Sequence, residues 1–394
     1  MNAPASVATS AWVLLQGSTE FFPALIQAID AAQAEVCFET YLFNVAGQGQ
    51  AVAAALEQAA LRGVRVMVVL DGAGSRDVSP EWLNRWSQAG VEWRIFDPLG
   101  AIGVWFPSRW RRLHRKLCVV DAQVAFCGGI NILDDWYDPH IQGVLDHPRL
   151  DYAVRLQGAC VGDVHAAMTQ LWARLEITRN LRARQVGAAL EALREPEPWP
   201  LAPSQGNIRL VLRDNLRHRL SIQRSYLRAI GRARSEILIA NAFFFPGRKF
   251  RRALALAAQR GVRVRLLLPG YYEYVVPYRA SRVVYRQLLA AGVEIHEYHA
   301  SYLHAKVAVI DDQWATVGSS NLDPLSLLLA REANLVIHDR GFARALKQRL
   351  LDAMAWGSHR VLPRQTPLRW VEALLDRISY GLMRVLILLT ARRY

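Results

Sequence analysis

Lysine is scarce in this sequence of 394 residues. Arginine supplies almost all of the 48 basic residues, and lysine occurs only as Lys116, Lys249, Lys306 and Lys347. Since arginine stands nearly everywhere that either residue would serve, we expect each retained lysine to have a chemical reason. Lys116 and Lys306 recur in the motif described below. Lys249 and Lys347 are expected to be solvated, and Lys249 lies in a basic segment that suits anionic head groups.

Cysteine is also rare. The four cysteines are Cys37, Cys118, Cys127 and Cys160, and no two of them form a CxxC pair. This spacing argues against a disulfide framework and against a zinc site, and it favours a reducing compartment. Three of the four lie in apolar, strand-like runs, where a small buried thiol is the usual interpretation.

Long apolar runs are absent as well. No segment reaches the roughly 18 uncharged apolar residues that indicate a membrane-spanning helix. The N-terminus lacks the pattern of a signal peptide. The nearest approach to a span is residues 368–394, whose apolar residues are interrupted by charges. That pattern predicts an amphipathic helix over residues 364–394, which either lies in a membrane interface or packs on the protein's own core.

The charge balance favours an anionic partner. The chain carries 34 acidic residues against the 48 basic ones, a net charge of +14. Nucleic acid, an acidic membrane surface and a phosphate-bearing substrate all fit this excess, and charge alone does not choose among them.

The sequence contains an internal duplication. Residues 31–43 and 59–72 (AAQAEVCFETYLF and AALRGVRVMVVLDG) correspond to residues 232–244 and 257–270 (RARSEILIANAFF and AAQRGVRVRLLLPG). Each copy alternates helices with apolar strands and ends in a hairpin-like pair. This order predicts an α/β fold of two similar halves, each a mixed β-sheet flanked by helices.

Four prolines in residues 194–207 indicate a linker between the halves. The expected organisation is an N-terminal half over residues 1–193, this linker, a C-terminal half over residues 208–363, and the amphipathic helix over residues 364–394.

One motif, H-x-K-x4-D-x6-G-[GS]-x-N, occurs once in each half. The first copy comprises His114, Lys116, Asp121, Gly128, Gly129 and Asn131, and the second comprises His304, Lys306, Asp311, Gly318, Ser319 and Asn321. Residues two apart project from the same face of a strand, so each histidine and its lysine are expected to point the same way. The aspartates, seven positions after the histidines, count with the histidines and lysines among the catalytic motif residues, although their odd offset favours a role in bracing a turn or the sheet.

Each half supplies only half of a catalytic site. If the halves face each other, two histidines, two lysines and two asparagines surround one phosphorus atom. A neutral imidazole then attacks phosphorus, with His114 favoured as the nucleophile, while His304 acts as general acid and base. Lysine ammonium groups and amide donors stabilise the charge on the phosphate oxygens, so no metal and no cofactor is required, and one monomer has a complete site.

The paired motif resembles the signature of the phospholipase D superfamily. Within that superfamily the chain is similar nearly end to end to bacterial cardiolipin synthases of the B type. The segments that carry the resemblance are residues 62–75, 111–131, 149–158, 241–247 and 314–340.

The resemblance implies a function and further site residues. His114 and His304 serve as nucleophile and acid/base, while the lysines and asparagines, with Gly129 and Ser319, bind the substrate phosphate. Asp151 and Glu332 match the position of a carboxylate that orients a catalytic histidine. The implied reaction transfers a phosphatidyl group from one phosphatidylglycerol to another and releases glycerol. The implied partners are phosphatidylglycerol, other anionic phospholipids and a membrane surface, with the protein peripheral on the cytoplasmic face of the cell membrane.

Three other functions fit parts of the pattern. A phospholipase D-type hydrolase shares the covalent intermediate and differs only in admitting water as the acceptor. A nuclease of the superfamily suits the positive charge, but the aromatic segments 101–110 and 271–285 fit acyl chains better than bases. No nucleic acid partner is therefore expected. A binding module without catalysis is disfavoured because both motif copies are intact.

Overall fold

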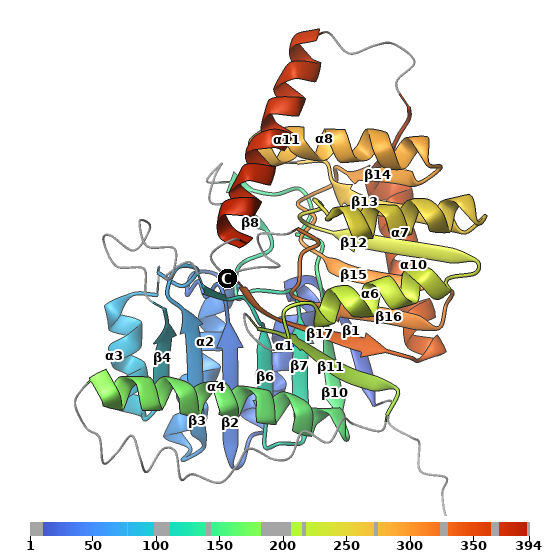
Figure 1. Cartoon of the computed structure of the whole chain (residues 1–394). Helices are drawn as coiled ribbons and strands as arrows, with labels where there is room; N and C mark the ends of the chain where they lie inside the picture. The colour runs from blue at the N-terminus through green and yellow to red at the C-terminus, as the bar shows by residue number, and fades with distance from the viewer. Residues whose placement is uncertain are drawn as a thin grey trace, which may run out of the picture.

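The chain forms two α/β halves that face each other (Figure 1). In this computed structural model the described residues are 11–76, 78–97, 111–138, 143–182, 206–214, 218–271, 275–323, 330–363 and 370–391. The expected linker lies outside them up to residue 205. The aromatic segment 101–110 and residues 272–274 of the second aromatic segment also lie outside.

The N-terminal half is built on a seven-stranded mixed sheet. Its strand order is β1 (Trp12–Gln16), β10 (Tyr152–Gln157), β7 (Val124–Gly128), β6 (Leu117–Val120), β2 (Glu35–Thr40), β3 (Arg65–Asp71) and β4 (Glu92–Phe96). Strands β2, β3 and β4 are parallel, and the other neighbours are antiparallel. The half also contains the helices α1 (Gly17–Asp30), α2 (Gln48–Leu61), α3 (Pro80–Ala89) and α4 (Cys160–Arg182), with a short pair β8 (Tyr137–Asp138) and β9 (Gly143–Val144).

The C-terminal half repeats this order and adds one edge strand. Its sheet runs β11 (Ile208–Arg213), β17 (Ala330–Ile337), β16 (Trp314–Gly318), β15 (Lys306–Ile310), β12 (Glu236–Asn241), β13 (Arg263–Pro269), β14 (Glu294–Tyr298) and β18 (Ser358–Val361). Its helices are α6 (Ser221–Arg232), α7 (Arg248–Gln259), α8 (Val275–Ala290), α10 (Arg340–Gly357) and α11 (Trp370–Ala391). The duplicated α/β fold predicted from the sequence is confirmed.

Three apolar cores hold the layers together. One core joins the outer face of the N-terminal sheet to α1, α2 and α3, and another joins the outer face of the C-terminal sheet to α6, α7 and α8. The third core lies between the halves and includes side chains of both sheets, of α4 and of α10. Because this central core is shared, burial of apolar surface holds the two inner faces against each other.

A glycine follows the end of α2 and of α7, within the RGVRV sequence that both halves contain. Gly63 follows α2 with φ +90°, and Gly261 follows α7 with φ +87°. This left-handed conformation suits glycine, which has no Cβ, and it lets the chain turn directly into the next buried strand.

Two short pairings cross between the halves near the motifs. Strand β5 (Arg112–Leu113) belongs to the N-terminal half by sequence but pairs in parallel with the start of β17. Leu150 forms the corresponding parallel bridge with Leu303. These pairings place both histidine motifs at the junction of the halves.

Among the described residues, no helix is both long enough and apolar enough to cross a bilayer. The expected C-terminal helix is present as α11. One of its faces packs on α8, where Asp376 lies 3.0 Å from Arg286, and the other face is exposed.

Candidate active site

The two histidines occupy equivalent positions on either side of the junction. The backbone N–H of His114 donates to the carbonyl oxygen of Arg331 at 3.0 Å, and that of His304 donates to the carbonyl oxygen of Leu150 at 2.9 Å. Each histidine is therefore fixed by the opposite half, at the residue before a carboxylate. The prediction that each histidine and its lysine lie together in a strand is wrong. Strand β6 begins at Leu117, after the first pair, and β15 begins at Lys306, after His304.

Each histidine is paired with the carboxylate of the other half. Nδ1 of His114 lies 3.0 Å from Oε2 of Glu332, and Nδ1 of His304 lies 2.6 Å from Oδ2 of Asp151. Both carboxylates are buried. A carboxylate on Nδ1 fixes the tautomer and the ring orientation, and leaves Nε2 for chemistry. The structure thus brings Asp151 and Glu332 to the histidines, in crossed pairs.

The electrostatics of the two pairs differ. Burial raises the pKa of Asp151 to about 6, against the opposing effect of Lys306 and the Tyr152 N–H. Burial acts in the same direction on Glu332, but His114, Lys116 and the Ser319 hydroxyl outweigh it and lower the pKa of Glu332. The carboxylate beside His114 is therefore the more firmly ionised of the two at neutral pH.

Both histidines favour the neutral imidazole in the free protein. Burial lowers the pKa of His114, and Glu332 opposes this shift. Burial, reinforced by Lys306 and Lys116, holds the pKa of His304 well below its ordinary value. A substrate phosphodiester would supply the negative charge that this cationic site lacks, and would raise the pKa of both imidazoles.

The two motif lysines lie beneath the histidines. Nζ of Lys116 donates to the carbonyl oxygen of His114 at 2.8 Å, and Nζ of Lys306 donates to that of His304. Burial lowers the pKa of Lys116 to about 7, although Glu332 opposes the shift. Buried ammonium groups next to the histidines are suited to bind a phosphate oxygen.

The remaining phosphate-binding candidates come directly after the ends of β7 and β16 or within three residues of them. Oδ1 of Asn131 accepts from the Leu42 N–H at 3.3 Å, while the buried Oδ1 of Asn321 makes no hydrogen bond within the described part of the chain. Ser319 donates its hydroxyl to Glu332. At Gly129 a Cβ would lie 2.4 Å from Oδ1 of Asp151, so a glycine is needed for this carboxylate to reach His304.

The two motif aspartates lie away from the histidines. Asp121 accepts the backbone N–H groups of residues 33–35, and Asp311 accepts those of residues 234–236. Both have a positive φ, of 50° and 53°, in the turn between two strands. Each therefore ties a hairpin turn to the start of the neighbouring strand, the bracing position expected from its odd offset.

Three residues near the site were not identified from the sequence. Asp71 is buried at the end of β3 and accepts the Leu113 N–H at 2.7 Å, which fixes β5 just before His114. The ring of Tyr41 lies 4.9 Å from the ring of His114. Arg115 points away from the site and pairs with buried Glu39. A carboxylate directly after a buried strand, as in VVLDG, was the one available signal for Asp71.

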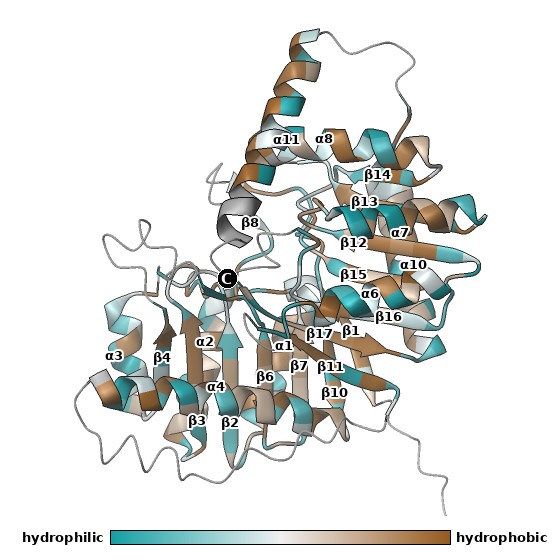
Figure 2. Cartoon of the chain, viewed as in Figure 1, coloured by the Kyte–Doolittle hydropathy of each residue, from teal (hydrophilic) through white to brown (hydrophobic). Residues whose placement is uncertain are grey.

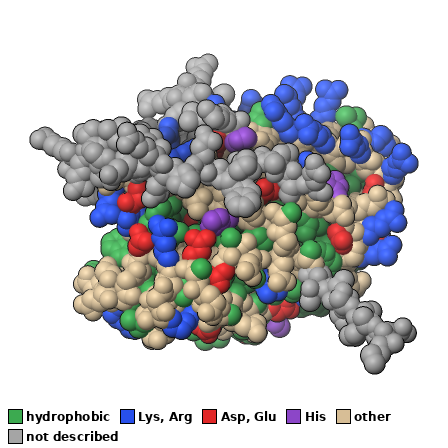
Figure 3. Space-filling model, turned by 90° about the horizontal axis from the view of Figure 1, so that it is seen from below, with side chains coloured by type: hydrophobic (Ala, Val, Ile, Leu, Met, Phe, Trp, Pro, Cys, Tyr) green, Lys and Arg blue, Asp and Glu red, His purple; other side chains and the backbone are tan. Residues whose placement is uncertain are grey.

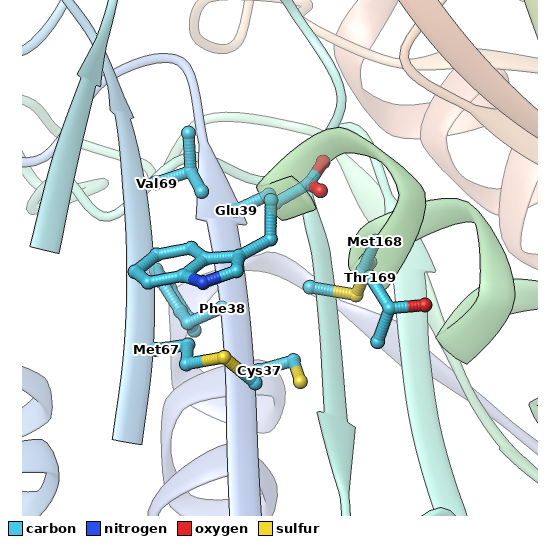
Figure 4. Close-up of a pocket in the computed structure, with 8 residues that line it drawn as sticks. Cys37, Phe38, Glu39, Met67, Val69, Met168 and Thr169 are labelled. Atoms are coloured by element: carbon cyan, nitrogen blue, oxygen red, sulfur yellow. The ribbon is translucent and has the colours of Figure 1, made fainter. Parts of the chain in front are cut away.

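A small cavity of about 10 Å³ lies below the site, between β2, β3 and α4 (Figure 4). Its lining is mostly apolar, with Glu39 on one side, and it holds at most one water. At the opposite end of β2, His165 on α4 lies 2.7 Å from Glu35. Cys37 lies close to this ion pair. None of these three residues contacts the catalytic histidines.

The chain is similar to known phospholipid-synthesising proteins. Residues 25–137 and 226–354 match the family described as cardiolipin synthase, phospholipase D-like domain. Cardiolipin synthase B of Escherichia coli (strain K12) is 40% identical over 357 residues, which cover 90% of this chain and 83% of the relative. A probable cardiolipin synthase of Bacillus subtilis (strain 168) is 29% identical over 338 residues, 85% of this chain and 64% of the relative.

Solved structures show the same fold. Phosphatidylserine synthase from Haemophilus influenzae Rd KW20 superposes with a TM-score of 0.69 over 95% of this chain and 93% of that protein, at 14% identity. The duplicated sheets, the matched halves and the relatives at 40% identity agree. The chain belongs to the cardiolipin synthase family of phospholipase D-like proteins.

Proposed function

We propose that this protein is a phosphatidyltransferase that makes cardiolipin and glycerol from two molecules of phosphatidylglycerol. The crossed histidine–carboxylate pairs carry the proposal, because they place two oriented imidazoles at one junction. The relatives named above are cardiolipin synthases, and their similarity extends over most of this chain.

In the first step, Nε2 of His114 attacks the phosphorus of one phosphatidylglycerol. Binding of the anionic phosphodiester favours protonation of His304 at Nε2. The P–N bond forms as the bond to the glycerol oxygen breaks, and His304 gives this Nε2 proton to that oxygen, so glycerol leaves. The attacking imidazole becomes cationic, and the ionised Glu332 beside it stabilises this charge.

In the second step, the terminal hydroxyl of another phosphatidylglycerol attacks the phosphohistidine. His304 takes the hydroxyl proton, the P–N bond breaks, and cardiolipin leaves with His114 restored. An imidazole with a low pKa is a strong acid once protonated, which suits His304 for donation to an alkoxide.

The phosphate is held by this chain's own donors. Lys116, Lys306, Asn131 and Asn321 are the candidates for its equatorial oxygens, and Ser319 and Gly129 shape the carboxylate positions beneath. Asp121 and Asp311 stabilise the fold of each half by accepting backbone N–H groups at the start of a neighbouring strand. The protein would work at the cytoplasmic face of the membrane as a peripheral protein, where its anionic substrate meets a chain of charge +14.

The test is to incubate the purified protein with phosphatidylglycerol vesicles and EDTA and to resolve the lipid products. We expect cardiolipin and glycerol from the wild type and neither from His114→Ala or His304→Ala. The control is His338→Ala, which removes an exposed histidine outside the site and should retain activity. Phosphatidic acid without cardiolipin would reassign the protein as a hydrolase, and absence of any lipid product would refute the proposal.

A further inference from the structure

The exposed face of α11 carries an apolar stripe. Val371, Leu375, Ile378, Leu382 and Val385 follow one another at alternating spacings of four and three residues, and each is between 41% and 56% exposed. Residues at this spacing lie on one side of a helix. Figure 2 shows apolar residues along much of this helix, which projects beyond the C-terminal half.

The opposite face of α11 is fixed to the protein. Asp376 is buried and lies 3.6 Å from Arg279 and 3.0 Å from Arg286, both on α8. The hydroxyl of Tyr380 accepts a hydrogen bond from Arg251 of α7 at 3.2 Å. These contacts determine the rotation of the helix, so the apolar stripe is held outward.

The helix α11 packs close to the loop of the C-terminal half that carries Asn321, one of the candidate phosphate-binding residues. The ring of Tyr380 packs 5.5 Å from that of Phe245, and the Phe245 N–H donates to the carbonyl oxygen of Leu322, the neighbour of Asn321. Two exposed aromatic residues also follow strands of the C-terminal half, since Phe243 lies two residues after β12 and Tyr271 two residues after β13. Through Tyr380, Phe245 and Leu322, α11 is therefore linked to the loop that carries Asn321.

The charges beside the stripe select its partner. Among the described side chains of α11, the exposed charged ones are Arg377 and Arg384, one helical heptad apart. The neighbouring helix α7 begins with exposed Arg248 and Lys249, and Lys and Arg side chains gather along one edge of the molecule in Figure 3. A second copy of α11 would bring arginine against arginine, whereas an anionic lipid surface pairs with these cations.

We infer that α11 is the membrane-docking element of this protein, with its apolar stripe buried at the acyl boundary of an anionic bilayer and its arginines among the head groups. The inference rests on the proposed function, which supplies a lipid substrate, and it assigns the surface that brings the catalytic edge to the bilayer. Interfacial binding of this kind needs an apolar face and flanking cations but no spanning helix.

Flotation with vesicles of phosphatidylcholine and phosphatidylglycerol tests the inference on the full chain. The variant Leu375→Glu with Leu382→Glu should lower the partition coefficient by about tenfold or more. The matched control is Leu61→Glu with Leu181→Glu, which adds the same charge at two leucines that are 60% and 54% exposed on other helices. The control should stay within about twofold of the wild type. Equal loss in both pairs, or no loss in the α11 pair, would overturn the inference.

Two further measurements separate docking from folding and from catalysis. A fluorophore sensitive to polarity on Leu382→Cys should shift to the blue when vesicles are added, and the same label on Leu61→Cys should not. With short-chain phosphatidylglycerol dispersed as monomers, the α11 pair should keep the wild-type rate. A wild type that floats but makes no product contradicts the proposed function alone. Product from monomers without flotation contradicts the docking inference alone, as does a dimer in lipid-free buffer that the α11 changes dissociate.

Discussion

The two halves share a strand order but differ at the positions that control charge. Beneath His114 and Lys116 the N-terminal half has the buried pair Arg115 and Glu39, with side chains 5% and 1% exposed. At the equivalent positions the C-terminal half has two buried alanines, Ala305 and Ala240. The fold therefore accommodates either an ion pair or small apolar residues here, with a histidine and a lysine at the same motif positions in both halves.

A second difference lies beside the carboxylates. Ser319 hydrogen-bonds Glu332, whereas Gly129, at the equivalent position, leaves Asp151 without a hydroxyl donor. The pKa of Glu332 is lowered, and that of Asp151 is raised to about 6. A single hydroxyl thus contributes to making two similar pairs chemically unequal, which suits one histidine to attack and the other to proton transfer.

The largest expected effect concerns the two roles proposed for the histidines, His114 as nucleophile and His304 as general acid and base. A phosphatidyl donor with a p-nitrophenol leaving group needs no proton from an acid. We expect His304→Asn to release one equivalent of nitrophenol in a burst and to retain the phosphatidyl group on His114, while its turnover of phosphatidylglycerol falls by about 10⁴-fold or more. His114→Asn should give no burst. A burst from His114→Asn alone would assign the nucleophile to His304.

The next largest effect concerns Asp151 and Glu332. Replacing either carboxylate should lower kcat by about 10³-fold, because the imidazole paired with it loses its orientation. Their effects on stability should have opposite signs. The folded pKa of Asp151 is above its ordinary value, so the ionised form costs stability above about pH 6, and this cost disappears as the pH falls toward 4. Asp151→Asn should therefore raise Tm at pH 7 by a few degrees (about 2–4 °C).

The folded pKa of Glu332 is below its ordinary value, so its ionised form adds stability at pH 7 that is lost in acid. Glu332→Gln should therefore lower Tm at pH 7. Asp135→Asn is the control, since burial raises the pKa of Asp135 to about 7 without contact to a histidine. It should raise Tm and leave catalysis in place.

In the wild type, kcat/KM should fall as the pH drops through about 6, where Asp151 takes up its proton. Equal Tm shifts for both carboxylate variants would contradict this contrast.

The buried ion pair predicts a stability effect of intermediate size. Arg115→Ala leaves the Glu39 carboxylate buried and unpaired, which should cost about 3 kcal/mol of unfolding free energy. Changing both residues to alanine recreates the arrangement of the C-terminal half and should cost less than the single change. The measurement is the urea midpoint followed by circular dichroism. A double variant that is less stable than Arg115→Ala would show that the halves are not interchangeable at this position.

The smallest expected effect is that of Ser319→Gly, which gives both halves a glycine. Loss of the hydroxyl bond to Glu332 should raise the pKa of this carboxylate and lower kcat by about tenfold. The stability that ionised Glu332 adds should be lost at a higher pH than in the wild type, which is followed as Tm against pH. The converse change, Gly129→Ser, should lower activity more, since its Cβ would meet the Asp151 carboxylate at 2.4 Å. If Ser319→Gly leaves the pH dependence of Tm unchanged, the serine does not contribute to the difference between the two carboxylates.

The sequence predicted the parts of the fold that repeat. The apolar strands and the two gap-free motifs are local patterns, and they sufficed to predict two α/β halves with facing histidines. Asp121 and Asp311 were placed as braces by strand geometry alone. Asp151 and Glu332 were named only through resemblance, because they lie 23 and 14 residues after their glycines and no local rule joins them to a histidine.

Contacts between distant segments could not be predicted in the same way. That Glu332 serves His114 and Asp151 serves His304 depends on the way the halves dock. The pairing of β5 with β17 has the same origin. The ion pair of Arg115 could not be predicted either, because its partner Glu39 is 76 positions away in the sequence. Amphipathicity left open whether α11 packs inward or faces lipid, and the structure shows one face packed and the other exposed.

The crossed carboxylates have a consequence for how such a chain can diverge. In a symmetric pair of identical subunits every substitution appears twice, so both catalytic positions must change together. When the two copies are joined in one polypeptide, a serine can arise beside one imidazole and a glycine can remain beside the other. Neither copy has a complete histidine–carboxylate pair alone, because the carboxylate of each copy pairs with the histidine of the other. Covalent linkage thus keeps each copy dependent on the other for its carboxylate, while the two sequences no longer have to be identical.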